Sequence, residues 1–346
     1  MRSTTWLNRF AWLTCIATLL LICSGGMVTS KGVGLAVPDW PTTFGYNMFL
    51  FPVSKWVGGI LFEHTHRLMG SIVGFLTIIL AMWLWPSENR QWVRNLGVIA
   101  LGGVIVQGVL GGLRVTMMKD EIGIFHACMA QAFLGLLVVI ALVTTNFWRT
   151  LENRPVDIQN FASTKTLVVA ITIAIYVQLG LGATMRHQHR DLAILDFPTA
   201  NGAWIPDTSA TALAKINAWR DGQGLSAVTA FQIWLQIVHR FLALVIATAI
   251  IAFCLRVLRE APGFIALKRL SIFWVAGLAC QIALGAWTIW SNKAADVATA
   301  HVALGAVMLS FGVSISAICW RISGRDSALR CPGAAARRPY HGEHVA

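Results

Sequence analysis

The segment GGMVTSKGVGLAVPDWPTTFG (residues 25–45) aligns without a gap on GATMRHQHRDLAILDFPTANG (residues 182–202). Both segments contain a Pro-Thr step and end in glycine, and Asp39 of the first falls on Asp196 of the second. Similarity between distant segments of one chain is the sequence mark of a repeated architecture. The chain is therefore predicted to consist of two similar halves.

The similarity continues beyond these segments. Three further matches occur in the same order in both halves: His66-Arg67 with His239-Arg240, VQGVLGG (106–112) with CQIALGA (280–286), and His126 with His301. The second half differs mainly by a longer outer loop after the matched segment. The two halves are expected to have the same order of helices and the same chain direction.

The composition places this repeated chain in a membrane. Hydrophobic residues make up 56% of the sequence and charged residues 12%, whereas soluble domains carry about 25% charged residues. The net charge of +12 would suggest a nucleic-acid partner in a soluble protein. Here it is expected to reside in cytoplasmic loops and a basic tail, so the lipid bilayer is the expected partner and nucleic acid is not.

Eight apolar segments are long enough to span a bilayer, which takes about 20 residues in a helix. They cover residues 8–28, 57–84, 93–113, 123–147, 166–185, 231–255, 270–290 and 299–320. With four spans in each half, the repeats run in the same direction. The predicted fold class is an all-α integral membrane protein whose eight transmembrane helices form two parallel four-helix bundles related by the internal repeat.

The basic residues predict the orientation. If the N-terminus is inside, the inner side collects Arg2, Arg9, Arg90 and Arg94 together with the basic residues of 149–165, 256–269 and 321–338. Cytoplasmic loops are the ones enriched in Lys and Arg. We expect a multi-pass protein of the cell (inner) membrane with both termini in the cytoplasm.

The repeat also predicts the domain organisation. Residues 1–150 form the first four-helix half and residues 166–322 the second. Between them lies a cytoplasmic linker, 151–165, and residues 323–346 are expected to be a disordered basic cytoplasmic tail.

Four of the nine histidines fall at equivalent places, near the outer ends of the even-numbered spans: His66, His126, His239 and His301. Each half thus offers two imidazoles from two helices. Zinc usually needs three or four protein ligands, and copper sites usually recruit Cys or Met as well. Haem iron takes two axial ligands, and a helix bundle can hold the macrocycle between its helices. The pattern favours one haem in each half, toward the outer face.

Small residues stand four positions after each histidine, namely Gly70, Ala130, Ala243 and Gly305. They could leave room for a porphyrin or allow close helix packing, and the sequence does not decide between the two. A hydrogen-bonded polar group is the ordinary explanation for a single intramembrane histidine, but four in a twofold pattern favour ligands.

Charged neighbours of the histidines carry further signals. Arg67 and Arg240 follow the first histidine of each half and could face haem propionates, the alternative being arginines that extend to the membrane surface. Glu63 precedes His66 by three residues, whereas the equivalent position before His239 is Gln236. A carboxylate in one half only predicts chemistry there, because a buried carboxylate can move protons. A surface glutamate is the alternative.

These motifs resemble those of haem A synthase. The similarity covers about residues 8–320 and rests on E-x-x-H-R (Glu63, His66, Arg67), the second H-R pair, the single histidines His126 and His301, and the VPDWPTTFG loop. The resemblance implies an enzyme, a haem-dependent oxidoreductase that oxidises the C8 methyl group of haem O to the formyl group of haem A. Two successive hydroxylations would give a geminal diol that loses water.

The resemblance also assigns roles. It implies that His239 and His301 are the axial ligands of a permanent haem b, while His66 and His126 ligate the iron of the substrate, haem O. Glu63 would act beside that substrate. Arg67 and Arg240 would then be the cofactor-binding residues that face the haem propionates. Many bacterial members carry a cysteine pair in the first outer loop, but AVPDWPTTF has none. A mechanism that needs a loop thiol is therefore in doubt for this chain.

Two other classes remain open at this point. A di-haem b-type electron carrier, linked to quinol, would use the same four histidines, although it would not explain the difference between Glu63 and Gln236. A transporter is disfavoured because many transporters have inverted repeats. The sequence does not name the electron donor or the oligomeric state. It also leaves open homo-oligomers and contacts with a haem O synthase or with terminal oxidase assembly factors.

Overall fold

The computed structural model describes residues 2–151, 161–188, 192–261 and 263–329. Within these residues, eight helices are long and apolar enough to cross a membrane. They are α1 (Arg2–Ser30), α2 (Gly58–Ser87), α3 (Gln91–Met117), α4 (Asp120–Val143), α6 (Phe161–Gln188), α8 (Ala230–Glu260), α9 (Ile265–Trp290) and α10 (Ala295–Leu329). Each of the eight predicted spans is confirmed as a helix, and the protein is an all-α integral membrane protein.

Helices form here because a lipid environment offers the backbone no hydrogen-bond partners, so each apolar segment must satisfy its own amide groups. Most helices extend a few residues beyond the predicted spans, and α10 continues to Leu329. Residues 152–160 of the predicted linker and 330–346 of the predicted tail lie outside the described residues. The domain boundaries proposed from the repeat stay a prediction.

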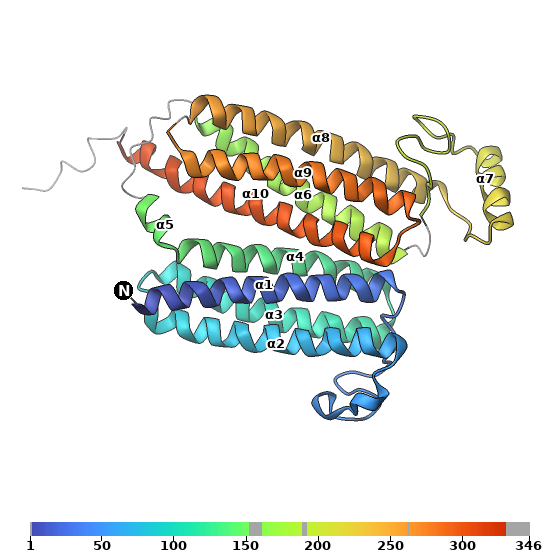
Figure 1. The fold of residues 1–346 in the computed structure, drawn as a ribbon, viewed down its shortest axis with the longest axis horizontal. Coiled ribbons are helices and arrows are strands. Elements are labelled where there is room, and N and C mark those ends of the chain that lie inside the picture. Colours follow the sequence, from blue (N-terminus) through green and yellow to red (C-terminus); the bar gives the residue numbers. More distant parts are fainter. Residues whose placement is uncertain (1, 152–160, 189–191, 262, 330–346) are drawn as a thin grey trace, which may run out of the picture.

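The helices pack as two groups of four (Figure 1). In the first group α1 packs on α2 and α4, and α3 completes the ring; in the second, α6 packs on α8 and α10, and α9 completes it. The groups meet where α1 contacts α10, α4 contacts α6, and α4 contacts α10. By the repeat, α1 corresponds to α6 and α4 to α10, so the two halves use equivalent helices to contact each other.

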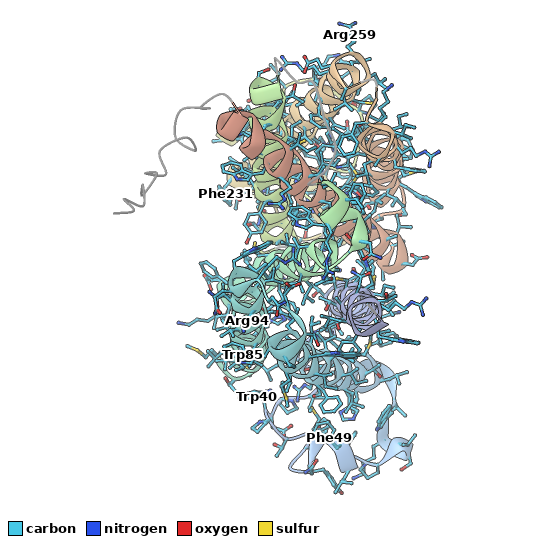
Figure 2. All side chains as sticks on the ribbon, turned by 90° about the vertical axis from the view of Figure 1, so that its left-hand side faces the viewer. Trp40, Phe49, Trp85, Arg94, Phe231 and Arg259 are labelled. Carbon is cyan, nitrogen blue, oxygen red and sulfur yellow. The ribbon has the colours of Figure 1, made fainter. Side chains whose placement is uncertain are left out.

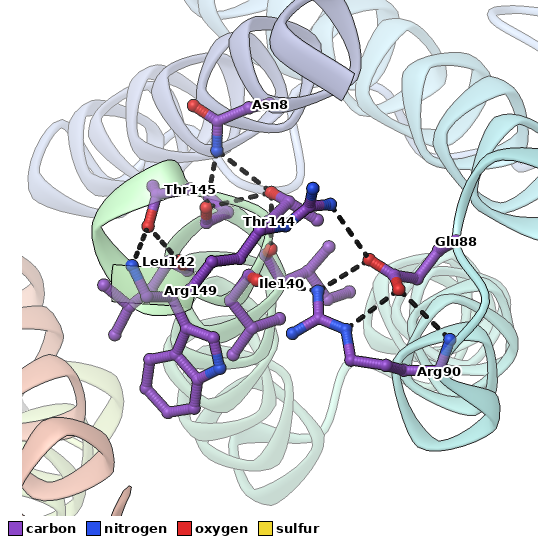
Figure 3. Close-up of polar contacts among 11 residues, drawn as sticks. Asn8, Glu88, Arg90, Ile140, Leu142, Thr144, Thr145 and Arg149 are labelled. Atoms are coloured by element: carbon purple, nitrogen blue, oxygen red, sulfur yellow. Dashed lines mark hydrogen bonds and ion pairs between the residues drawn. The ribbon is translucent and has the colours of Figure 1, made fainter. Parts of the chain in front are cut away.

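The inner end of the first half shows one difference from prediction, because the fourth helix stops at Val143 and not near residue 147. The short helix α5 (Asn146–Thr150) follows, and the Thr145 hydroxyl accepts a hydrogen bond from Trp148 N at its start. Asn8 of α1 donates to the Ala141 carbonyl (2.7 Å) and to the Thr144 hydroxyl (2.9 Å) (Figure 3). Such side-chain bonds compete with continued helix, which explains the break.

A second group of hydrogen bonds connects the helices at the same end of the first half. Glu88, between α2 and α3, accepts hydrogen bonds from Arg90 Nε (2.8 Å) and Nη2 (2.6 Å), and Arg90 Nη2 also donates to the Val143 carbonyl (2.8 Å) (Figure 3). The carboxylate and guanidinium therefore connect α2, α3 and the end of α4.

The outer connections are long in both halves. The first holds two short 3-10 helices, η1 (Met48–Leu50) and η2 (Val53–Lys55), and carries the exposed Trp40 and Phe49 (Figure 2). The second contains a helix that the sequence did not predict, α7 (Ala210–Gly222), which starts at the N-cap Ser209. It covers a small separate core that includes Ile194, Val228 and Ile233. The insertion in the second loop is thus a folded element.

Candidate functional site

The four repeat-related histidines occupy matching helices. His66 lies on α2 and His126 on α4, while His239 lies on α8 and His301 on α10. In each half the two helices face each other across the ring, since α2 packs on α1 and α3, and α8 packs on α6 and α9. The two histidines of each half are close enough to interact electrostatically. The structure therefore brings together one imidazole pair in each half.

Each of these imidazoles has a buried Nδ1 without a hydrogen bond of ordinary geometry to the described residues, and three of the four rings interact with a backbone carbonyl. An imidazole binds a metal through one ring nitrogen, and the other nitrogen usually faces a carbonyl or a water. Imidazole is a usual axial ligand of haem iron, and a bundle interior is a usual place for the macrocycle. Four rings that no described side chain holds fit a haem in each half.

A glycine lies against each of the four histidine rings. These glycines belong to α1 and α3 in the first half and to α6 and α9 in the second. The distances from a Cβ built on the glycine to the histidine Cε1 are as follows: Gly25 to His66, 2.8 Å; Gly111 to His126, 3.3 Å; Gly182 to His239, 3.5 Å; Gly285 to His301, 3.1 Å. Three of these four approaches are closer than ordinary van der Waals contact. The glycines of the repeated motifs thus make space for the imidazoles.

The two glycines that stand one turn after a histidine have different surroundings. A Cβ built on Gly70 would meet nothing within 4 Å, whereas one on Gly305 would lie 2.9 Å from Leu179 Cδ2. Gly305 is therefore explained by close helix packing, and Gly70 is not. The two positions are not repeat equivalents, because Gly70 matches Ala243 and Gly305 matches Ala130.

Glutamines form hydrogen bonds to the helices that carry the histidines. Gln107 donates to the His126 carbonyl (3.2 Å), and its repeat equivalent Gln281 donates to the His301 carbonyl (3.1 Å). Gln178 donates to the His239 carbonyl (2.9 Å). These bonds join neighbouring helices at the depth of the imidazoles.

The two outer loops begin with the same turn. Asp39 accepts hydrogen bonds from Thr42 Oγ1 (2.5 Å), Phe44 N (2.7 Å) and Gly45 N (2.9 Å). Asp196 accepts from Thr199 Oγ1 (2.7 Å), Asn201 N (2.7 Å) and Gly202 N (2.9 Å). The two glycines have positive φ values of 76° and 79°, which glycine adopts without strain. The repeat thus extends to individual hydrogen bonds.

These carboxylates predict a pH dependence of stability. Partial burial acts to raise the pKa of Asp39 and of Asp196, but the hydrogen bonds that each accepts outweigh burial and hold the pKa below its ordinary value. A lowered folded pKa stabilises the protein above the unfolded pKa of about 4, and the contribution is lost as pH falls through the folded value. Thermal unfolding in detergent should therefore show the melting temperature falling below about pH 4.

The matched variants are Asp39→Asn and Asp196→Asn. Each should lower the melting temperature at neutral pH and flatten its dependence on pH in the acid range. An unchanged acid dependence in the double variant would show that other groups cause it.

The arginines beside the histidines hold these loops. Arg67 donates through Nη1 to the carbonyls of Asp39 (2.6 Å) and Thr42 (3.1 Å), and through Nη2 to the Val37 carbonyl (2.8 Å). Arg240 does the same in the second half, with the carbonyls of Asp196 (2.8 Å) and Thr199 (2.8 Å). The structure thus gives both arginines a loop-anchoring role, and their predicted contact with propionates stays a prediction.

Glu63 and Gln236 accept hydrogen bonds from equivalent backbone amides of the two loops. Glu63 Oε2 accepts from Val37 N (2.9 Å), and Gln236 Oε1 accepts from Ile194 N (3.0 Å). Gln236 also donates to the Ile194 carbonyl (3.1 Å), whereas Glu63 Oε1 instead pairs with Arg67 Nη2 (2.7 Å). Glu63 is 3% exposed and Gln236 6%. Glu63 is therefore a buried residue and not a surface glutamate. The two halves differ in charge at this position, where each side chain binds its loop.

His64 has a different environment from His66. It is fully buried, its Nδ1 lies 3.2 Å from Thr43 Oγ1, and its ring contacts those of Phe51 and Trp56 at centroid distances of 5.1 and 4.7 Å. The side chain anchors the first outer loop to α2. His64 has no equivalent histidine in the second half, where Ile237 stands at its place.

The first loop also depends on Gly112. A Cβ built there would lie 2.6 Å from Cε2 and Cε3 of the Trp40 indole. Gly112→Ala should therefore displace the indole and cost about 1–3 kcal/mol, as overpacking does. Thermal unfolding and the rate of proteolysis of the loop would measure the effect.

The repeat supplies the matched rescue. Trp40 corresponds to Phe197 and Gly112 to Ala286, so the second half combines a smaller ring with a methyl group. Adding Trp40→Phe to Gly112→Ala should recover most of the stability, as a double-mutant cycle would show. Purely additive losses would contradict this packing account.

Three basic residues at the contact between the two halves were missed from sequence: Arg114 at the end of α3, and Arg186 and His187 at the end of α6. The repeat contained a signal, because their equivalents are the uncharged Thr288, Thr29 and Ser30. A basic residue whose repeat equivalent is uncharged could have been noticed as Glu63 was.

Comparison with known proteins agrees with this architecture. A family model described as cytochrome oxidase assembly protein (COX15-CtaA) matches residues 8–313. A protein of Shouchella clausii named heme A synthase is 32% identical over 60% of this chain and 68% of its own length. One of Halalkalibacterium halodurans with the same name is 30% identical over 58% of this chain and 66% of its own length.

A third relative aligns with nearly the whole chain. The heme A synthase of Shewanella oneidensis is 24% identical over 94% of this chain and 99% of its own length. The family match spans both histidine pairs, both outer loops and all but the last part of the eighth span. The chain belongs to the COX15-CtaA family of cytochrome oxidase assembly proteins.

Proposed function

We propose that this protein is a haem A synthase that oxidises the C8 methyl group of haem O to a formyl group. The chain is an enzyme, an oxidoreductase of haem A biosynthesis, by its family and by the names of its relatives. The observation that supports the specific reaction is the single charge difference between two otherwise matching sites. Glu63 lies buried beside the first histidine pair, and the neutral Gln236 takes its place beside the second.

The proposal divides the two sites by role. His66 and His126 hold the substrate, haem O, and His239 and His301 hold a resident haem b. The bound haem b supplies redox chemistry to the protein. In support of this division, only the first pair has a buried carboxylate, Glu63, one turn before its first histidine.

Glu63 is the residue proposed to handle protons. Its two carboxylate oxygens are held by Val37 N and Arg67 Nη2, and it lies one helical turn before His66 on the same face of α2. A carboxylate fixed in this way can accept or donate a proton at a defined position near the substrate. The loop held by the same carboxylate would help to exclude water from that position.

Location and partners follow from the orientation. We propose that the protein lies in the inner cell membrane with both termini in the cytoplasm, because the basic residues gather on that side. Both histidine pairs then lie toward the outer face, below the two outer loops. Haem O is so apolar that direct delivery by a haem O synthase is consistent with this arrangement. Each of the two hydroxylations would consume molecular oxygen as the oxidant, and an electron donor is required because the second oxygen atom is reduced to water.

Pigment extraction tests the proposal. The purified protein should yield haem B together with haem O or haem A, identified by chromatography and absorbance. Two haem B molecules per chain without haem O or A would support a di-haem electron carrier instead. A protein that binds no haem at all would exclude both functions.

A further inference from the structure

Three basic side chains converge at the outer end of the contact between the two halves. Arg186 of α6 donates through Nη2 to the Gly26 carbonyl and the Ser30 hydroxyl of α1. A Cβ built on Gly123, in the first turn of α4, would lie 2.7 Å from His187 Nδ1 and 3.2 Å from Arg114 Nε. His187 and Arg114 therefore meet over the same glycine. This interhalf cluster consists of Arg114, Arg186 and His187.

Two of these groups have unused hydrogen-bond donors. The Arg114 side chain donates no hydrogen bond to any described residue, and the Nε of Arg186 is buried without a partner. The carboxylates that act electrostatically on Arg114 are Glu63 and the exposed Asp120, and Glu63 already accepts from Arg67 and from Val37 N. Buried guanidinium groups normally bind an anion, often through two parallel hydrogen bonds. The cluster lacks such an anion among the described residues.

Neither arginine of the cluster is repeated in the other half. Arg114 of the first half corresponds to Thr288, and Arg186 of the second half corresponds to Thr29. Both threonines satisfy their hydroxyls within their own helix, Thr288 on the Leu284 carbonyl (2.8 Å) and Thr29 on the Gly25 carbonyl (3.0 Å). The two cations are therefore not part of the repeated architecture, and they come together where the two halves meet.

The cluster also lies between the two histidine pairs. Arg114 interacts electrostatically with His66 and His126, and Arg186 with His301. Arg67, the residue first expected to bind propionates, uses Nη1 and Nη2 for the loop carbonyls and Glu63. The free donors nearest the first pair therefore belong to Arg114.

We propose that Arg114 and Arg186 bind a propionate carboxylate of the haem held by His66 and His126, and so orient the substrate. The inference rests on the proposed function, because it takes the first pair as a haem site. The only other anion expected at this depth is the phosphate of a lipid headgroup, and the experiment separates the two.

Arg114→Gln is the most informative variant, because Arg114 holds no described residue by its side chain whereas Arg186 connects two helices. Purified protein in detergent would be titrated with haem b and with its dimethyl ester, which lacks both propionate charges. Binding to the first site is measured as the part of the absorbance change that is present in the wild type and absent in the His66→Ala variant. Arg94→Gln is the control, since Arg94 lies at the other end of α3 and donates to Gln91 (2.5 Å).

Arg114→Gln should weaken first-site binding of the diacid by about tenfold to a hundredfold, the range for a charged hydrogen bond. Binding of the ester should change little, and Arg94→Gln should affect neither ligand. The ester should also bind the wild-type protein more weakly than the diacid does.

Three results would overturn the proposal. Equal affinity for diacid and ester in the wild type and the variant would show that no propionate is bound. Equal weakening of both ligands would show that Arg114 shapes the site without binding the carboxylate. If vesicles containing phosphatidylglycerol raise the melting temperature of the wild type but not of Arg114→Gln, with haem affinity unchanged, the anion is a lipid phosphate. Absence of any binding dependent on His66 would instead reject the haem site and the proposed function.

Discussion

Glu63→Gln is expected to lower the conversion of haem O to haem A by at least about a hundredfold, the usual loss when a proton-transfer group is removed. The variant should still fold, because a glutamine can accept the hydrogen bond from Val37 N as Gln236 does from Ile194 N. Conversion would be measured by chromatography of haems extracted from membranes that are supplied with haem O.

The control for this variant is Glu121→Gln, which removes an exposed carboxylate near the start of α4. It should leave conversion unchanged. Thermal unfolding and the b-type absorbance of Glu63→Gln should match those of the wild type. Conversion at the wild-type rate would exclude Glu63 from the mechanism, and a large fall in stability would mean that its role is to hold the loop.

His239→Ala and His301→Ala are each expected to remove most of the b-type absorbance of the purified protein. Under the proposed function each imidazole supplies one of two ligands, so the alanine variant would leave the iron without a replacement side chain. Absorbance spectra of reduced and oxidised protein, with haem quantified after extraction, would measure the loss.

His66→Ala is the matched variant in the other half. It should keep the resident b-type signal but lose bound haem O and the conversion to haem A. His64→Ala should retain the signal too, because its ring contacts Phe51 and Trp56 of the loop. If His66→Ala lost the resident haem while His239→Ala kept it, the roles of the two pairs would be reversed.

The sequence predicted the helices and the placement of the four histidines because both follow from local rules. A bilayer accepts long apolar helices, so each span could be found from its length and composition. The repeat then identified which polar residues had equivalents. His66 and His239 are recognisable in this way from the amino-acid sequence, and they occupy matching positions on α2 and α8.

The contacts of the charged side chains could not be predicted in the same way. Arg67 reaches three loop carbonyls only because the loop turns back over α2, and the path of a loop is not contained in a periodic pattern. Arg114 and His187 meet through two helices from different halves. The break at Thr144 likewise depends on Asn8, more than a hundred residues away.

The arrangement of the interface has a consequence for electron flow. α4 and α10 contact each other at the centre of the protein, where Gly135 of α4 faces Val313 of α10. His126 belongs to the first of these helices and His301 to the second. Under the proposed function each iron site would thus have one ligand on a central helix, and electrons could pass between the two haem sites through packed protein. One external donor could then serve both sites, without a separate docking surface for each half.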